Sequence, residues 1–62
     1  MTDKDLIKRL MLQTGQKCIA DALGYGKYNQ PIDYVQYENV VYGENITFEF
    51  DQRTGDLIAV YS

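Results

Sequence analysis

The spacing of apolar residues changes part of the way along this 62-residue chain, and the change limits the folds that the chain can adopt. Up to Leu23 the apolar residues recur at intervals of three and four, which places side chains on one side of a helix. From Tyr34 onward apolar and polar residues alternate, which is the period of a half-buried strand. The sequence therefore predicts one N-terminal helix followed by strands.

The helix is expected over about residues 3–23. Thr2 is a suitable N-cap, and Asp3 and Asp5 follow it in the first turn, where the helix dipole favours carboxylates. Asp5 stands where a capping box has Glu or Gln, so the sequence predicts an incomplete box. The apolar stripe of this helix consists of Ile7, Leu10, Met11, Cys18 and Ala22.

Thr14-Gly15 is the weak point of the predicted helix. Glycine inside a helix costs about 1 kcal/mol relative to alanine. Gly15 lies on the apolar stripe, where close approach of the helix to a sheet would justify it, and we favour a continuous helix ended by Gly24. The alternative is a break at Thr14-Gly15 into two short helices, with Thr14 capping the second.

The remainder of the chain predicts a loop and three strands. Residues 24–33 contain two glycines, an asparagine and a proline, which is typical of a loop. Segments rich in β-branched and aromatic residues follow at about 34–42, 45–51 and 56–61. Gly55 suits the left-handed position of the second hairpin turn. We therefore expect a single α+β domain over residues 1–62, with one helix packed on a three-stranded antiparallel meander.

Alternation assigns the strand residues to two faces. The face covered by the helix is expected to hold Ile46, Phe48, Phe50, Ile58 and Val60, with Phe50 across from Ile58 and Phe48 across from Val60. It also receives Val35, Tyr37 and Val41 if the first hairpin has a two-residue loop. One helix cannot cover both faces of the sheet. The uncovered face then holds Tyr34, Val40, Tyr42, Thr47, Glu49, Leu57, Ala59 and Tyr61.

The composition argues against catalysis and against a bound cofactor or metal. The chain has no histidine for acid–base chemistry near neutral pH. Cys18 lies on the predicted apolar stripe, so we expect a buried structural residue there. One cysteine without histidine cannot build the usual zinc site, and it cannot form a disulfide within the chain.

The N-terminal ten residues are charged where a signal peptide would be apolar, and no apolar run approaches the length of a membrane span. A single cysteine is typical of a reducing compartment. We therefore expect a soluble cytoplasmic protein that makes no contact with a membrane.

The predicted function is protein binding through the uncovered sheet face. Tyrosine supplies large contact area at low entropic cost and is enriched at interfaces. The predicted partner-binding residues are Tyr34, Tyr42, Glu49, Leu57 and Tyr61. A second copy of the chain would suit this face. So would a basic, nucleic-acid-handling protein that this chain inhibits or regulates, as small acidic proteins of phages and mobile elements do.

Charge is divided unequally between the halves of the chain. Residues 1–32 carry five basic and three acidic side chains, a net charge of +2, and residues 33–62 carry one basic and six acidic side chains, a net charge of −5. This asymmetry is consistent with a charged partner or with head-to-tail self-contact, but a solvated acidic sheet explains it more simply. An acidic sheet would also repel the phosphates of a nucleic acid.

Two alternatives to the predicted function remain. One is nucleic-acid binding by helix lysines and loop tyrosines, namely Lys4, Lys8, Lys17, Lys27, Tyr25 and Tyr28. The other is a purely structural homo-oligomer.

Overall fold

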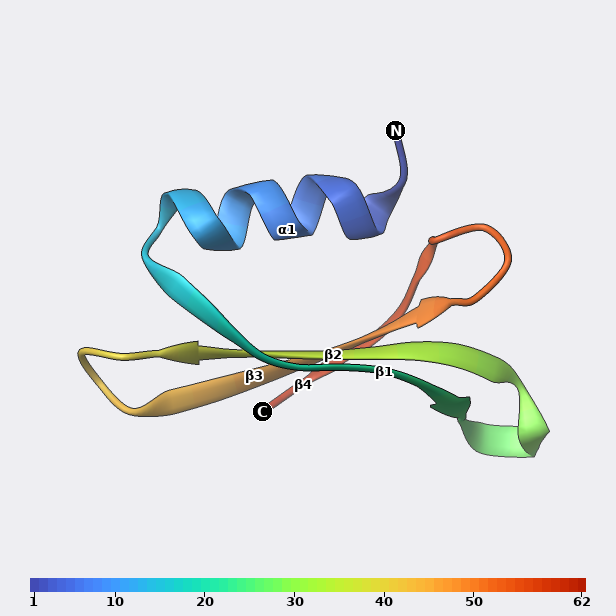
Figure 1. Cartoon of the computed structure of the whole chain (residues 1–62). Helices are drawn as coiled ribbons and strands as arrows, with labels where there is room; N and C mark the ends of the chain where they lie inside the picture. The colour runs from blue at the N-terminus through green and yellow to red at the C-terminus, as the bar shows by residue number, and fades with distance from the viewer.

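The computed structural model describes the whole chain, residues 1–62, as one helix and four strands. The elements are α1 (Asp3–Gln13), β1 (Gln16–Tyr25), a 3₁₀ turn η1 (Lys27–Asn29), β2 (Pro31–Asn39), β3 (Glu44–Asp51) and β4 (Leu57–Tyr61). The strands form one antiparallel sheet in the order β1-β2-β3-β4, and α1 lies over one of its faces (Figure 1). The predicted α+β class, with an N-terminal helix on an antiparallel meander, is confirmed. The predicted number of three strands is wrong, because the sheet has four.

The start of α1 is fixed by reciprocal capping hydrogen bonds. The backbone N–H of Asp5 donates to Oγ1 of Thr2 at 3.2 Å, and the backbone N–H of Thr2 donates to Oδ2 of Asp5 at 3.4 Å. The capping box is thus complete, although the sequence predicted an incomplete one. The Thr2 hydroxyl also donates to Oδ2 of Asp5, at 3.0 Å. This bond and that from the Thr2 N–H hold the pKa of the Asp5 carboxyl below its ordinary value, because both favour its ionised form.

The end of α1 corrects the sequence-based boundary. The helix stops at Gln13 rather than near residue 23, and Gly15 follows in the left-handed region with φ of +80°. The alternative break at Thr14-Gly15 is therefore the correct one. The segment after the break is not a second helix, however, but the strand β1.

β1 includes residues 16–23, which helical spacing had assigned to the helix. It pairs along its length with β2, from Gln16 opposite Asn39 to Tyr25 opposite Pro31. This pairing satisfies the backbone of both strands, and such long-range contacts override the local helical preference. The predicted loop over residues 24–33 shrinks accordingly to the connection between β1 and β2. Pro31 is tolerated as the first residue of β2, where no ladder donor is required.

The core lies between α1 and the two central strands. It is built from Val35 and Tyr37 of β2 and from Phe48 and Phe50 of β3, with the partly buried Ile7, Met11 and Ile46 packed against it. The ring of Phe48 meets that of Tyr37 edge to face and that of Phe50 in a stacked arrangement, each at 6.0 Å between centroids. These central residues occupy the face that alternation predicted.

The register of β4 departs from the prediction at one position. Val60 lies opposite Phe48, as predicted, but Leu57 rather than Ile58 lies opposite Phe50. An irregularity between these pairs inserts Ile58 as an extra residue, which reverses the face of Leu57. Val41 is also misplaced by the prediction, because it lies exposed in the β2–β3 turn.

α1 is attached to the sheet differently on its two sides. Toward β4, the backbone N–H of Lys4 donates to the carbonyl of Gly55 at 3.1 Å, and Oδ2 of Asp3 accepts the N–H of Leu57 at 2.9 Å. Toward β1 and β2, the Lys4 ammonium pairs with the carboxylates of Asp33 and Asp21. Helical spacing then directs Leu6 and Leu10 to the same side as Asp3, above β4.

Little of this chain is buried. Seven of its 62 residues are buried, and the accessible surface is 4463 Å². A folded monomer of this mass is expected to expose about 4,100 Å². The helix α1 contains no fully buried residue. It is also too short and too polar to cross a lipid bilayer.

Candidate interaction surface

The sheet face opposite α1 carries no helix, and we call it the outer face (Figure 1). The register places Tyr34 of β2 beside Glu49 of β3, and Glu49 beside Ala59 of β4. Tyr61 follows two residues after Ala59 and therefore points to the same face. On the β1 side, Tyr34 has Ala22 as its neighbour, whose small side chain leaves the tyrosine ring uncovered on that flank.

A hydrogen bond organises the acidic group on the outer face. The Tyr61 hydroxyl donates to Oε2 of Glu49 at 2.7 Å. This bond raises the pKa of Tyr61 to about 12, with smaller contributions from burial and from the negative charge of Glu49. The phenol therefore stays protonated throughout the physiological range and holds the carboxylate in one orientation.

A shallow groove runs beside this pair, and we call it the outer groove. It is lined by Gly26, Lys27, Tyr28, Gln30, Ile32, Glu49, Ile58, Ala59 and Tyr61. Ile32 forms its apolar floor and is buried. A Cβ atom on Gly26 would lie 3.2 Å from Cγ2 of Ile32 and 3.4 Å from Oε1 of Glu49. The β1–β2 connection thus approaches the sheet closely and forms one wall of the groove.

The same wall presents an aromatic side chain in an unfavourable backbone conformation. Tyr28 has φ of +57° and is 99 % exposed. Positive φ is uncommon for residues other than glycine and asparagine, and it costs on the order of 1 kcal/mol or more. Asn29 also has positive φ, at +58°, but asparagine tolerates it. Nothing within the chain compensates the strain at Tyr28 by burying its ring.

Three of the five residues predicted to bind a partner lie together. Tyr34, Glu49 and Tyr61 share the outer face, and Tyr34 is near enough to contribute to the raised pKa of Tyr61. Leu57 lies on the opposite face, because Ile58 is the extra residue in β4.

Tyr42 is 76 % exposed in the β2–β3 turn and belongs to neither face. That turn is longer than predicted because Asn39 builds it: its Oδ1 accepts the N–H groups of Val41 and Tyr42. Its carbonyl also accepts the N–H of Gly43 at 2.7 Å. Val40 likewise lies exposed in this turn and not on the outer face.

Sequence reasoning placed six residues of the groove elsewhere, and the three with large apolar or aromatic side chains are the most important. Ile32 and Tyr28 were assigned to a loop, and Ile58 was assigned to the covered face. Ile32 continues the alternation of β2 toward Pro31, so extending the strand by three residues would have found it. No sequence signal marks Ile58 as an inserted residue.

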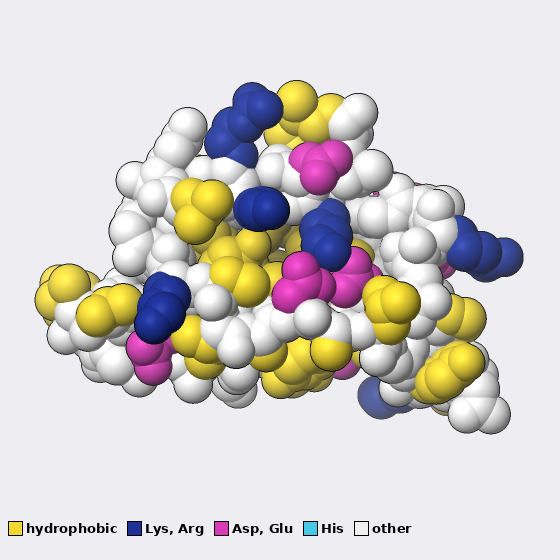
Figure 2. All heavy atoms as spheres, in the orientation of Figure 1, with side chains coloured by type: hydrophobic (Ala, Val, Ile, Leu, Met, Phe, Trp, Pro, Cys, Tyr) yellow, Lys and Arg dark blue, Asp and Glu magenta, His cyan; other side chains and the backbone are white.

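The basic residues do not form one continuous patch. Lys4 is engaged by Asp33 and Asp21, and Lys17 lies opposite Glu38 in the sheet. Figure 2 shows Lys and Arg side chains dispersed over the visible face, several of them beside Asp or Glu. The set of lysines and tyrosines considered for nucleic acid is thus divided between ion pairs and separate parts of the fold.

Cys18 does not occupy the core. It lies on β1, exposed to solvent, and its Sγ is 3.5 Å from the carbonyl oxygen of Ala20. The prediction of a buried structural cysteine is wrong, because it depended on the helical stripe that ends at Gln13. No group of three Cys, Asp or Glu side chains lies close enough to hold a metal ion.

No protein-family model, curated protein or solved structure matches this chain.

Proposed function

We propose that this protein is a non-catalytic interaction module that binds a basic protein through its outer groove. One observation carries the proposal: apolar side chains surround a carboxylate, Glu49, that Tyr61 holds in a fixed orientation. An ionised carboxylate has about four acceptor positions, and the hydroxyl of Tyr61 takes one of them.

The chemistry of the groove defines the partner. The free positions on Glu49 suit the N–H groups of an arginine or lysine, and Ile32 suits an apolar side chain beside it. The net charge of −3 assists association with a basic protein by steering the encounter. Inhibition or regulation of such a protein is the role that we expect.

Strain at Tyr28 supports this proposal independently. A fully exposed aromatic ring at positive φ weakens the free protein and has no function within it. At the wall of a binding groove, the same ring supplies contact area to a partner. Strained residues of this kind cluster at binding sites.

In the first test, the immobilised wild-type protein captures the partner. The affinity of the wild type and of each variant for that partner is then measured. Glu49→Gln removes the charge and keeps the size of the side chain, and we expect binding to weaken by roughly 10-fold to 100-fold. Glu44→Gln is the matched control, an exposed glutamate on the same strand outside the groove, and it should bind like the wild type. Equal effects of the two variants would contradict the proposal.

The second test uses Tyr28→Asn, because asparagine tolerates the observed φ. The variant should bind the partner more weakly while its free energy of unfolding stays the same or increases. A residue with a structural role only would lose stability and retain binding, and this result would exclude Tyr28 from the interface.

A further inference from the structure

The strand β4 forms an uncharged edge of the sheet. Its sequence, Leu-Ile-Ala-Val-Tyr over residues 57–61, contains no charge, no proline and no glycine. Its only partner is β3, so every second residue directs its N–H and C=O groups away from the sheet. Such an edge is a template for pairing with another strand, and monomeric proteins usually block it with charges, bulges or covering segments. Of these devices β4 has the inserted residue Ile58, and it has no charge.

Apolar side chains of α1 lie on the same side of the molecule as this edge. The bond from Leu57 to Asp3 fixes which side of the helix faces β4, and Leu6 and Leu10 follow Asp3 at spacings of three and seven. Leu6 is 49 % exposed and Leu10 is 53 % exposed. Leu57 and Val60 are also exposed beneath them, on the face of β4 that α1 overhangs. We call these four residues the apolar seam.

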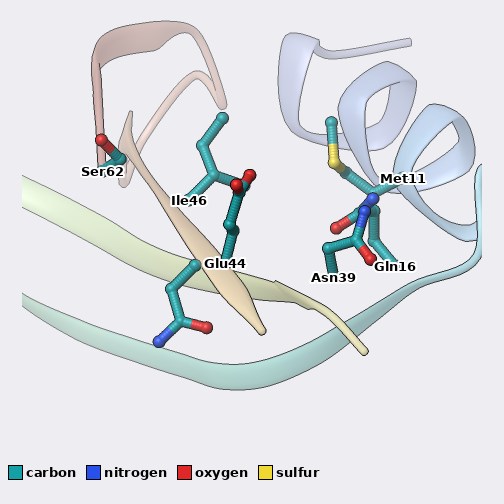
Figure 3. A pocket seen from close by; sticks show the side chains of 7 residues that line it. Met11, Gln16, Asn39, Glu44, Ile46 and Ser62 are labelled. Atoms are coloured by element: carbon teal, nitrogen blue, oxygen red, sulfur yellow. The ribbon is translucent and has the colours of Figure 1, made fainter. Parts of the chain in front are cut away.

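The seam continues into an open notch at the C-terminal end of α1. β4 ends at Tyr61 opposite Thr47, so the first three residues of β3 have no neighbour on that side. The notch there is lined by Met11, Gln16, Asn39, Glu44, Asn45, Ile46 and Ser62. Figure 3 shows Met11 on the helix and Ile46 on β3 facing this space. The space between α1 and the sheet is thus open at this end, where Met11 and Ile46 are its apolar residues and the other lining residues are polar.

We propose that β4 pairs with β4 of a second copy of this chain across a two-fold axis. The two strands run antiparallel, and the two sheets join into one of eight strands. The apolar seams then cover each other, with Leu6 and Leu10 of one copy facing the same residues of the other. The apolar seam lies on the sheet face opposite the outer groove, although Ile58, Ala59 and Tyr61 of β4 line that groove.

Self-complementarity favours a second copy over a different protein. In a two-fold dimer each patch meets itself, so a charged patch on an acidic chain would repel its partner. The seam and the edge contain no charged residue, although the chain has a net charge of −3. The nearest carboxylates, Asp3 and Asp56, lie at the start of β4, and antiparallel pairing places those of the two copies at opposite ends of the interface.

The small core supplies a thermodynamic reason for the dimer. Only five apolar residues are buried, and domains of this size often need oligomerisation for stability. Pairing of two edges satisfies backbone groups and buries the seam in one step. A specific interface buries about 800 Å² on each partner. Each partner contributes four half-exposed side chains and one strand edge to the proposed interface.

The test measures the mass of the protein in solution by sedimentation equilibrium. We expect the wild type to be a dimer of 7.2 kDa chains. Leu10→Lys places a charge in the seam and should weaken the dimer roughly 100-fold, since an unpaired buried charge is costly. Leu12→Lys is the matched control, because Leu12 is 55 % exposed on the same helix but lies beside Lys8 and Arg9 on its opposite side. It should remain a dimer.

Ile58→Lys tests the strand edge itself, since edge lysines block pairing. Circular dichroism shows whether each monomeric variant remains folded. Amide hydrogen exchange of the wild type provides a test that does not depend on the folding of a variant. Dilution dissociates the dimer, so the amides of β4 should exchange faster while those of β1 remain unchanged.

Three outcomes would overturn the proposal. The first is a wild type that is monomeric at millimolar concentration. The second is a dimer that resists both Leu10→Lys and Ile58→Lys, which would use another surface. The third is a monomer whose β4 amides become protected only when a different protein is added, which would assign the edge to a strand of that protein.

Discussion

The two edges of the sheet, β1 and β4, differ in length and in charge. β1 has ten residues, carries Lys17 and Asp21, and is interrupted by an irregularity at Ile19. β4 has five residues, no charge and an irregularity at Ile58. Charges and bulges are the devices by which native proteins protect an edge. Because both edges contain an inserted residue, charge is what distinguishes them: β1 carries charged side chains and β4 carries none.

The helix reinforces this difference. Its polar side faces β1, where Lys4 pairs with Asp21 and Asp33. On the β4 side, the hydrogen bonds of α1 come from the Lys4 N–H and the Asp3 carboxylate, and Leu6 and Leu10 are half exposed. Both edges need protection from pairing with another strand, and on the β1 side charged side chains provide it. The experiments below disturb each side in turn, beginning with the largest expected effect.

The attachment of α1 beside β4 depends on Gly55. This residue has φ of +78°, and a Cβ atom there would lie 2.7 Å from Cβ of Thr2, the N-cap of the helix. Gly55→Val should therefore lower the free energy of unfolding by about 3 kcal/mol, through backbone strain and overpacking together. Denaturant titration measures this change.

Arg53→Ala is the control for that measurement, because Arg53 occupies the same turn and its side chain is 83 % exposed. It should change the free energy of unfolding by less than about 0.5 kcal/mol. Comparable losses in the two variants would show that the turn tolerates a side chain at residue 55.

The attachment of α1 on the β1 side depends on Lys4. Its hydrogen bond with Asp33 holds the pKa of the ammonium above its ordinary value of 10.5, although burial acts against this. Oδ1 of Asp33 is buried and has no hydrogen-bond partner, so Lys4 is the main compensation for this carboxylate. Lys4→Met should lower the free energy of unfolding by about 2 kcal/mol, because it leaves the Asp33 charge uncompensated.

A double variant distinguishes the loss of the ion pair between Lys4 and Asp33 from the loss of packing by the Lys4 side chain. The double variant Lys4→Met with Asp33→Asn should be more stable than Lys4→Met alone, since no buried charge remains. Lys8→Met is the exposed control on the same helix and should have little effect. A double variant less stable than both single variants would indicate that Asp33 does not need its partner.

The period of the apolar residues was sufficient to predict most of the fold, but it did not predict the edge strand β1. From residue 34 onward the alternation was strong enough to place Val35, Tyr37, Phe48 and Phe50 in the core. Residues 16–25 fit both periods, and their choice of a strand depends on pairing with β2, which no local pattern contains. The break itself was visible in the sequence as Gly15.

The candidate site was predictable to the extent that alternation continued without interruption. Tyr34, Glu49 and Tyr61 were placed on the outer face correctly because the register holds for each of them. Leu57 was misplaced because the inserted residue at Ile58 depends on how β4 fits against β3. Tyr42 was misplaced because Asn39 hydrogen-bonds into a turn longer than the assumed one.

The hydrogen bond from Tyr61 to Glu49 gives β4 a distinctive alkaline titration. The pKa of Tyr61 is raised to about 12 from an ordinary value of 10.0. The folded protein therefore retains this proton where the unfolded chain loses it, so the stabilisation is complete below pH 10 and disappears as the pH rises through 12. Because Tyr61 is nearly half exposed, we expect a contribution below about 1 kcal/mol.

Tyr61→Phe isolates this contribution. The tyrosinate absorbance of the wild type minus that of the variant should titrate near pH 12, and the stability of the variant should fall less steeply between pH 10 and 12. The raised pKa of Tyr37, which is caused mainly by burial, is present in both proteins and cancels. A difference curve centred near pH 10 would show that the bond to Glu49 does not form.

The smallest expected effect concerns Cys18 on the protected edge. Because this thiol is exposed on β1, a thiol reagent should react with it at a similar rate in native buffer and in denaturant. Cys18→Ser should change the free energy of unfolding by less than about 0.5 kcal/mol. A bulky maleimide at Cys18 should leave the mass in solution unchanged, since β1 and β4 are opposite edges of the sheet. The same label on Ile58→Cys, in a Cys18→Ser background, should convert the dimer to monomers. If instead the label on β1 dissociates the dimer and the label on β4 does not, the roles of the two edges are reversed, and the charges of β1 do not protect it.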